Sequence, residues 1–324
     1  MSEVVCLGIL VADVVARPVR RWPEEGKLVL VEQMELHTGG CAVNTGTALA
    51  RLGIGVTVIG KVGDDPFGDF MVASLQREGI RTDGIRREPG VHTSATMVCV
   101  SPGGERSFIH YLGANAELTD TDVDFSLLKG ARLLHIGSAF LVPKLDGEPL
   151  ARVLRRAREM GVMTCVDTAW DGSGRWMDAL APALPYADYC VPSLEEARQI
   201  TREHEPEEIA RVLLAAGVKV VGIKMGDKGC YVRSATEEHF VPAFHVEAVD
   251  ATGAGDAWVA GFLAGVVKGR SLKESALLGN AVGAMSVTAM GASGGIRSFA
   301  ETEAFMARTP LRAETDRERH ETLP

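Results

Sequence analysis

One glycine-rich segment constrains the fold of this chain more than any other. Residues Val249–Phe262 read Val-Asp-Ala-Thr-Gly-Ala-Gly-Asp-Ala-Trp-Val-Ala-Gly-Phe. The run from Ala257 to about Lys268 is apolar and free of proline, which predicts a buried helix. The start of a helix leaves backbone N–H groups unpaired and carries about half a positive charge. Because small residues let an anion approach that backbone, the segment predicts a site for phosphate or a developing oxyanion.

Asp256 stands beside this predicted anion site, where a bound anion would repel its carboxylate. Such a position favours a chemical role, for example accepting a proton from an attacking hydroxyl. From the residues alone an alternative stays open, in which Asp256 caps the helix and the glycines form a turn.

The composition fits either two average domains or one large α/β domain, since the chain has 324 residues and 46% of them are apolar. Lys and Arg number 34 against 43 Asp and Glu, the net charge is -9, and no basic run predicts a nucleic-acid partner. With no signal-peptide pattern and no apolar stretch of about 18 residues, we expect a cytoplasmic protein without membrane contact. The six cysteines are scattered without a CxxC pair, which favours buried free thiols over disulfides or zinc ligands.

Strand and helix patterns alternate along most of the chain, which predicts an α/β fold with a doubly wound, mostly parallel sheet and helices on both faces. The predicted strands after the first are Leu133–Ile136, Val162–Val166, Tyr189–Val191 and Val218–Ile223. The predicted helices are Ala42–Leu52, Leu150–Met160, Leu194–Thr201, Glu207–Ala216 and Leu272–Ala289. The first apolar run, Val4 to Val11, predicts a central strand that leads to Asp13 at the sheet edge where ligands bind.

Two segments have a different pattern and predict a second, small sheet. Lys27–His37 alternates as exposed strands do, and His92–Leu112 has a hairpin pattern with a turn at Ser101–Gly104. Both flank the first helical unit, so they can meet in space. The expected division is an α/β core of residues 1–13, 39–91 and 113–309, a β lid of residues 14–38 and 92–112, and a charged C-terminal tail of residues 310–324.

One motif is a decoy. Residues 55–61 fit the phosphate-loop pattern GxxxxGK, but Val62 follows where that loop needs a Ser or Thr hydroxyl for Mg²⁺. The β-branched run Val56–Ile59 predicts a core strand instead.

Two motifs in this chain resemble the signatures of the ribokinase-like (PfkB) carbohydrate kinases. Val-Asp-Ala-Thr-Gly-Ala-Gly-Asp, ending at Asp256, resembles their C-terminal signature. Gly-Gly-Cys-Ala-Val-Asn, from Gly39 to Asn44, resembles their N-terminal signature, and the likeness extends from Asp13 to about Gly295. It implies an ATP-dependent kinase in which Asp256 is the base and the N–H groups of Gly253, Ala254 and Gly255 form the anion hole.

The resemblance also implies which residues bind the acceptor. The residues that match the family's sugar grip are Asp13, Gly39, Gly40 and Asn44. The small sheet is expected to act as a lid that excludes water from the sugar, and as the contact of a homodimer. Cys41 stands where ribokinases proper often carry lysine, which leaves the identity of the sugar open.

On the donor side the resemblance implies sites for ATP, Mg²⁺ and potentially K⁺. The residues that match the ATP site are Ser193, Lys224, Gly226, Gly229 and Asn280. Glu196 matches the glutamate that holds Mg²⁺ through water, although the Ser193–Glu196 spacing equally fits a helix capping box. The residues that match a monovalent-cation site are Asp250, Thr252, Ser286, Ala289 and Gly291.

The function implied is transfer of the γ-phosphoryl group of ATP to a hydroxyl of a small sugar, ribose- or fructose-like. A 2-keto-3-deoxy sugar acid stays open, with Arg106 or Arg175 as carboxylate partner, as does a nucleoside stacked on Phe108 or Tyr111. A catalytically silent sugar-binding regulator is the non-enzyme alternative. A nicotinamide-dependent oxidoreductase is disfavoured, because no GxGxxG opens the first βα unit.

Overall fold

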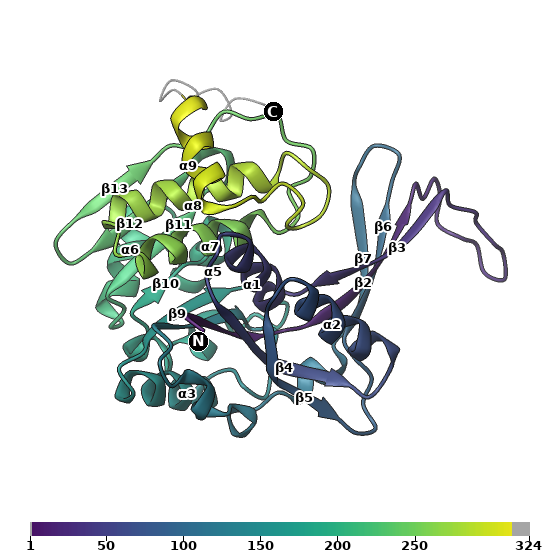
Figure 1. Ribbon diagram of the computed structural model, residues 1–324, viewed down its shortest axis with the longest axis horizontal. Helices are drawn as coiled ribbons and strands as arrows, with labels where there is room; N and C mark the ends of the chain where they lie inside the picture. The colour runs from purple at the N-terminus through teal and green to yellow at the C-terminus, as the bar shows by residue number, and fades with distance from the viewer. Residues whose placement is uncertain (1, 313–324) are drawn as a thin grey trace.

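The computed structural model describes residues 2–312 and is built around a large, mostly parallel sheet (Figure 1). Its strand order is β13-β12-β11-β10-β9-β8-β1-β4-β5, and β12 and β13 run antiparallel at one edge. The strands are β1 Val4–Gly8, β4 Val56–Gly63, β5 Arg81–Glu88, β8 Leu133–Ala139, β9 Met163–Thr168, β10 Tyr189–Cys190, β11 Val220–Lys224, β12 Cys230–Ser234 and β13 Glu238–Val241. The predicted fold class is confirmed.

Helices cover both faces of this sheet. On one face pack α1 Cys41–Arg51, α2 Pro66–Arg77, α7 Ala254–Val267 and α8 Leu272–Ser286. On the other face pack α3 Glu148–Glu159, α4 Trp176–Leu180, α5 Leu194–Thr201 and α6 Pro206–Ala215, while α9 Phe299–Arg308 lies against α8. Short 3-10 turns span Gly113–Glu117, Asp120–Asp122, Phe125–Leu128, Leu184–Tyr186 and Gly226–Lys228. The helix predicted from Ala257 is the most deeply buried of these elements, and α7 packs mainly on α8 and α1.

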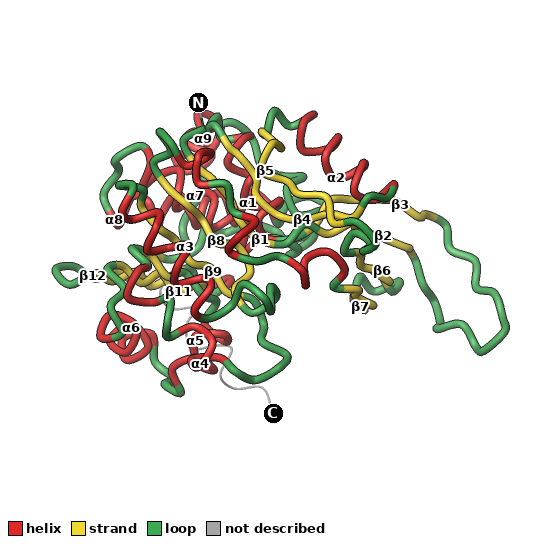
Figure 2. Tube along the Cα trace, turned by 90° about the horizontal axis from the view of Figure 1, so that it is seen from below, coloured by secondary structure: helices red, strands yellow, loops and turns green. Residues whose placement is uncertain are grey.

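A second sheet of four strands projects from one side of the core, as Figures 1 and 2 both show. Its order is β3-β2-β6-β7, with β2 Val11–Arg17, β3 Gln33–Gly39, β6 Ala95–Val100 and β7 Arg106–Tyr111. We call this four-strand sheet the lid. Two predictions need correction. The first central strand ends at Gly8, so Asp13 lies within β2, and residues 27–32 form no strand because they have no strand beside them to pair with.

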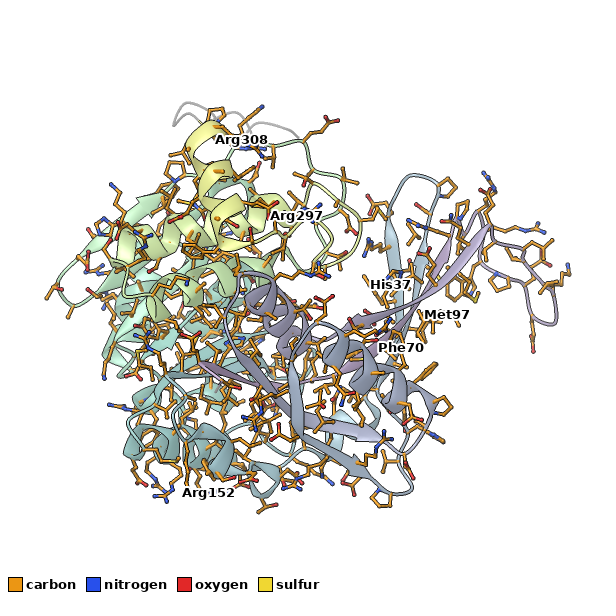
Figure 3. All side chains as sticks on the ribbon, viewed as in Figure 1. His37, Phe70, Met97, Arg152, Arg297 and Arg308 are labelled. Carbon is orange, nitrogen blue, oxygen red and sulfur yellow. The ribbon has the colours of Figure 1, made fainter. Side chains whose placement is uncertain are left out.

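The strand register gives the lid two chemically different faces. Asp13 is opposite His37 and Thr96, and Val15 is opposite Glu35 and Val98, so these side chains share the face toward the core. The opposite face carries an apolar row of Leu36, Val14, Met97 and Ile109. His37 belongs to the first face and Met97 to the second (Figure 3). One face is therefore suited to a polar ligand and the other to an apolar contact.

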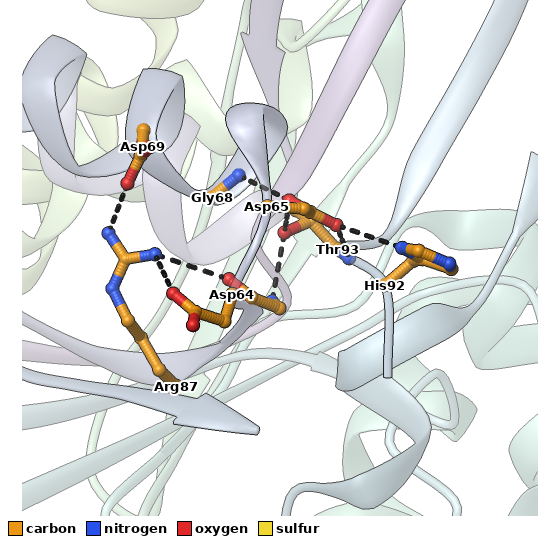
Figure 4. A network of polar contacts seen from close by, with 8 residues as sticks. Asp64, Asp65, Gly68, Asp69, Arg87, His92 and Thr93 are labelled. Carbon is orange, nitrogen blue, oxygen red and sulfur yellow. Dashed lines mark hydrogen bonds and ion pairs between the residues drawn. The ribbon is translucent and has the colours of Figure 1, made fainter. Parts of the chain in front are cut away.

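The lid is attached to the core by a polar network at the start of β6 (Figure 4). Asp65 caps α2 by accepting from the N–H of Gly68 at 2.8 Å. The same carboxylate accepts from the N–H and the hydroxyl of Thr93, both at 2.7 Å. Arg87 contacts Asp69 and Asp64 beside this network. These contacts fix the point at which the chain enters the hairpin.

The remaining expectations have mixed outcomes. Residues 56–63 form the buried strand β4, so the phosphate-loop reading is excluded, and Lys61 pairs with Glu88 and Asp122. The six cysteines are free, and all but Cys41 are buried. Among residues 2–312 no helix is long and apolar enough to cross a membrane. Of the predicted tail, residues 313–324 lie outside the described residues, whereas Leu311 pairs with Phe244 in an isolated bridge.

Candidate active site

The predicted anion site is the loop that leads into α7. Gly253 is the N-cap residue and has φ 69°, a left-handed conformation that favours glycine. A Cβ atom at this position would lie 2.5 Å from the Cβ of Ala292, so a side chain has no room. The N–H of Ala254 donates to the carbonyl of Ala251 at 3.2 Å, which leaves the other amides at this helix start as the freer donors.

Asp256 lies in the first turn of α7 and is only 9% exposed. Its Oδ2 accepts from Nδ2 of Asn44 at 2.8 Å, a contact that joins α1 to α7. Burial raises the pKa of Asp256, while the Asn44 hydrogen bond and the positive charge of Lys224 oppose the rise. A buried carboxylate with a raised pKa accepts a proton more readily than an exposed one.

A cavity of about 560 Å³ lies on one side of Asp256, and we call it the donor cavity. It collects the residues predicted to bind ATP and to transfer its phosphoryl group: Ser193, Glu196, Lys224, Gly226, Gly229, Gly253, Ala254, Gly255, Asp256 and Asn280. Cys41 and Arg312 line it as well. Segments far apart in sequence therefore meet in one space large enough for a nucleotide.

Lys224 and Asp167 form an ion pair inside the donor cavity, with Nζ and Oδ1 2.7 Å apart. Burial raises the pKa of Asp167 to about 7, against the opposing attraction of Lys224. Burial alone would lower the pKa of Lys224, but the carboxylates of Asp167 and Glu196 outweigh it and raise that pKa. Lys224 also lies near Gly255, since a Cβ there would be 3.6 Å from Nζ. A fixed positive charge thus stands beside the helix start.

Asp167 is a site residue that the sequence analysis missed. It lies near the carboxyl end of the parallel strand β9, the edge where open α/β sheets bind ligands. In the sequence, the signal for this residue was a polar side chain at the carboxyl end of a predicted strand.

Glu196 and Ser193 form the capping box that their spacing predicted. The hydroxyl of Ser193 accepts from the N–H of Glu196 at 3.4 Å, and Oε2 of Glu196 accepts from the N–H of Ser193 at 2.9 Å. Oε2 also accepts from the hydroxyl of Thr168 at 2.9 Å. Mg²⁺ in kinases is bound by one or two carboxylates together with substrate phosphates and water, and Glu196 and Asp167 fit that donor set. No group of three or more His, Cys, Asp or Glu within residues 2–312 is arranged to hold a metal on its own.

Asn280 is placed on the wall of the donor cavity, but its side chain is largely engaged by the protein. Its Oδ1 accepts from the indole of Trp258 at 2.8 Å, and its Nδ2 donates to the carbonyls of Val241 and Pro242, both at 2.9 Å. The contacts shape the wall, and a direct role toward adenine stays a prediction.

A second cavity of about 440 Å³ lies between the lid and the core, and we call it the acceptor cavity. It is lined by Asp13, Gly39 and Asn44 of the predicted sugar site, while Gly40 serves as the N-cap of α1. Gly39 permits a close approach, because a Cβ there would lie 2.2 Å from Oδ2 of Asp13. Burial raises the pKa of Asp13 to about 6, against the hydrogen bond from Thr96 and the charges of His37 and Arg106.

The arginines around the acceptor cavity have partners within the protein. Arg51 binds Glu78 through two hydrogen bonds of 3.1 and 2.7 Å. Arg17 donates to Gln33 at 2.7 Å and to Glu35 at 3.4 Å. Arg106 pairs with Asp250. Arg175, the other arginine considered for a carboxylate ligand, pairs with Asp146 and is not among the residues that line this cavity.

Asp250, predicted to bind a monovalent cation, already has strong donors on its carboxylate. Arg106 and the N–H of Gly291 donate to Oδ2, and the N–H of Thr252 donates to Oδ1 at 2.9 Å. These bonds outweigh burial and lower the pKa of Asp250. Of the other predicted ligands, Ser286 is buried and donates its hydroxyl to the carbonyl of Gly283 at 2.8 Å, and Ala289 lies just past the end of α8. The carboxylate therefore fits an ion pair with arginine, and a cation would depend on backbone carbonyls.

Comparison with known proteins is consistent across three kinds of similarity. Residues 1–298 match the family described as pfkB family carbohydrate kinase. Fructokinase-2 of Zea mays is 30% identical over 285 residues, which cover 83% of this chain and 85% of that protein. A ribokinase of Thermotoga maritima has a TM-score of 0.81 at 26% identity, with 95% of this chain and 100% of that one covered. A ribokinase II candidate from E. coli, solved with ATP and Mg²⁺, has a TM-score of 0.82 at 26% identity, with 95% and 100% covered.

Proposed function

Because this chain belongs to the PfkB family of carbohydrate kinases, we propose that it transfers the γ-phosphoryl group of ATP to a hydroxyl of a small neutral sugar, fructose- or ribose-like. The observation that carries the proposal is the position of Asp256. Its carboxylate lines the donor cavity and is held by Asn44, which lines the acceptor cavity. A base at this junction can reach an alcohol on one side and a phosphoryl group on the other.

In the proposed reaction the sugar lies in the acceptor cavity, with hydroxyls bound by Asp13 and Asn44. Asp256 accepts the proton of the attacking sugar hydroxyl while the hydroxyl oxygen bonds to the γ-phosphorus. The bond from the γ-phosphorus to the oxygen that bridges it to the β-phosphorus breaks, and ADP leaves. First-turn N–H groups of α7 and the ammonium of Lys224 stabilise the charge on the transferring group. Phosphoryl transfer needs little covalent chemistry from the protein, so positioning and charge stabilisation carry most of the rate acceleration.

We propose that Glu196, through water, and Asp167 hold the Mg²⁺ that accompanies ATP. When bound, the ion neutralises phosphate charge. A K⁺ ion near Asp250 and Thr252 is also part of the proposal, with its ligands mainly among the carbonyls of residues 286–291. Comparing rates in K⁺ and in tetramethylammonium at equal ionic strength tests this: equal rates would remove K⁺ from the proposal.

The paired arginines favour a neutral sugar over a sugar acid. At Arg17, Arg51 or Arg106 a substrate carboxylate would have to displace Glu35, Glu78 or Asp250 from an existing ion pair, whereas Arg77, which also lines this cavity, donates to the hydroxyl of Ser74 and the carbonyl of Ala73. A nucleoside is favoured less, because Phe108 lines the acceptor cavity whereas Tyr111 belongs to the opposite face of the lid. The 2-keto-3-deoxy sugar acid and nucleoside readings are thus secondary.

The test is a panel of sugars, sugar acids and nucleosides assayed for ADP release and for the phosphorylated product. We expect fructose or ribose to give the highest kcat/KM. A sugar acid or nucleoside at the top of the panel would replace the proposed acceptor class. ATP-binding without turnover on any acceptor would favour the sugar-binding regulator instead.

We also propose a homodimer through the outer face of the lid. The row Leu36, Val14, Met97 and Ile109 presents apolar side chains to solvent, and Met34 and Tyr111 on the same sheet are more than half exposed. Exposed apolar surface of this kind marks a contact site, and a two-fold symmetric interface would use this same face on both copies.

A further inference from the structure

One arginine of the lid reaches the loop that precedes the anion site. Arg106 is the first residue of β7, and its guanidinium donates to Oδ2 of Asp250 and to the hydroxyl of Thr252. The partners are 144 residues or more away in sequence. This is a direct contact between the lid and the loop that precedes the proposed anion site.

The ion pair is shielded from solvent. The side chain of Asp250 is 4% exposed and that of Arg106 is 20% exposed. Breaking a pair of this kind by removing one partner leaves a buried charge without compensation, which is strongly unfavourable. The contact is therefore of a different kind from surface ion pairs such as Arg20 with Glu32, which lie in the segment between β2 and β3.

Arg106 also belongs to the wall of the acceptor cavity. Its charge acts on Asp13, the residue proposed to bind sugar hydroxyls. Thr252 is directly followed by Gly253, the N-cap of α7. The side chain of Arg106 thus lines the acceptor cavity and also donates to Thr252, the residue before the proposed anion hole.

We propose that Arg106 is a positioning residue that couples closure of the lid to the geometry of the anion site. With the lid closed over a sugar, Arg106 fixes residues 250–252 and thereby the orientation of the N–H groups from Gly253 to Gly255. With the lid open the loop loses this bond, and transfer of the γ-phosphoryl group to water is suppressed because the anion site is incomplete. The inference rests on the proposed kinase function.

The Asp65–Thr93 network makes this coupling possible (Figure 4). It attaches the start of the hairpin to α2, and Arg106 lies on the returning strand. Arg106, opposite Val100, lies at the turn end of the hairpin, away from this attachment.

The experiment compares Arg106→Gln, Arg106→Lys and the control Arg17→Gln. Arg17 lines the same cavity on the same sheet but bonds only Gln33 and Glu35 of the neighbouring strand among the described contacts. We measure sugar phosphate formed, ADP released with and without sugar, and KM for ATP. Arg106→Gln should lower kcat/KM for the sugar by at least about 30-fold, with KM for ATP near wild type. It should also raise the ratio of ADP released to sugar phosphate formed, because transfer to the sugar falls while the slow transfer to water in the open state stays as in the wild type. Arg106→Lys should recover part of the rate, and Arg17→Gln should leave the ratio unchanged.

A double-mutant cycle with Asp250→Asn distinguishes coupling from general damage. If the two residues act together, the double variant should be no slower than the slower single variant. Additive losses, or an unchanged ratio in Arg106→Gln, would overturn the proposal. If Arg106→Gln fails to fold, Arg106→Lys and Asp250→Asn carry the same comparison. A wild-type protein that phosphorylates no acceptor would instead refute the proposed function, which keeps the two failures apart.

Discussion

At the scale of single residues, the proposed chemistry of the site depends on a few side chains whose protonation is set by burial and by neighbouring charges. Asp256, Asp13 and Asp167 are partly or fully buried carboxyls with raised pKa values. Lys224 is the opposing buried cation. Because neighbours decide the protonation of each, single substitutions that keep shape and remove charge are the sharpest tests.

Asp256→Asn should lower kcat by roughly 10²–10⁴-fold, because the amide cannot accept the proton of the attacking hydroxyl. The amide is nearly the same size and can still contact Asn44, so KM for sugar and ATP should change little. Steady-state kinetics with both substrates varied check this. Turnover near the wild-type value would remove Asp256 from the role of base.

The pH dependence of kcat/KM for the sugar should follow the protonation of Asp13. Its pKa of about 6 means that the carboxylate, which we propose accepts from sugar hydroxyls, is lost as the pH falls through about 6. We therefore expect kcat/KM for the sugar to fall on the acid side with that midpoint, and the acid limb to move or vanish in Asp13→Asn. An identical limb in the variant would assign the titration to another group, Asp256 first.

The same shift has a consequence for stability with a definite sign. The folded protein holds the Asp13 proton more tightly than an unfolded chain, whose carboxyl has a pKa near 3.8. Stability is therefore lost as the pH rises from about 4 to about 6. Asp13→Asn should raise the melting temperature at pH 8 relative to wild type, and a lower value would contradict this account.

At the scale of elements, the glycine-rich loops are built by backbone conformation that only glycine supplies without strain. Gly253 combines a positive φ with a crowded neighbour, Ala292. Both conditions follow from the entry of the loop into α7, whose first turn forms the proposed anion site.

Gly253→Ala should reduce kcat at least about 10-fold and destabilise the fold by more than the roughly 1 kcal/mol of backbone strain alone. The matched control is Gly53→Ala, because Gly53 has φ 80° but no atom within 4 Å of an added Cβ. Chemical denaturation and kinetics of both variants check the prediction. Equal effects in the two would show that crowding at Ala292 is unimportant.

Local elements of the fold and site were predictable from sequence, and long-range pairs were not. The helix after Gly253 and the capping box at Ser193 are signalled within a few residues, so their patterns were sufficient. The ion pair of Lys224 and Asp167 joins residues 57 apart, and neither side chain identifies its partner. The alternation of residues 27–32 predicted a strand wrongly, because a strand also needs a partner and Leu28 and Leu30 remain exposed.

At the scale of the whole molecule, the two faces of the lid have different proposed roles. Its inner face lines the acceptor cavity, and its outer face carries the apolar row proposed to meet a second copy. Substrate binding and assembly would then share one sheet of four strands.

Met97→Glu should convert the proposed dimer to a monomer, because it places a charge at the middle of the apolar row. Light scattering coupled to size exclusion gives the mass directly. Ala235→Glu, at the exposed tip between β12 and β13, is the control and should leave the mass unchanged. A wild-type protein that elutes as a monomer would refute the proposed contact.

The bond between Asn44 and Asp256 joins residues 212 apart. During synthesis the ribosome completes the lid and the sugar grip long before it adds the base. Because every described strand precedes Asp256 in the chain, a nascent chain can pair the strands of both sheets before the proposed base is present.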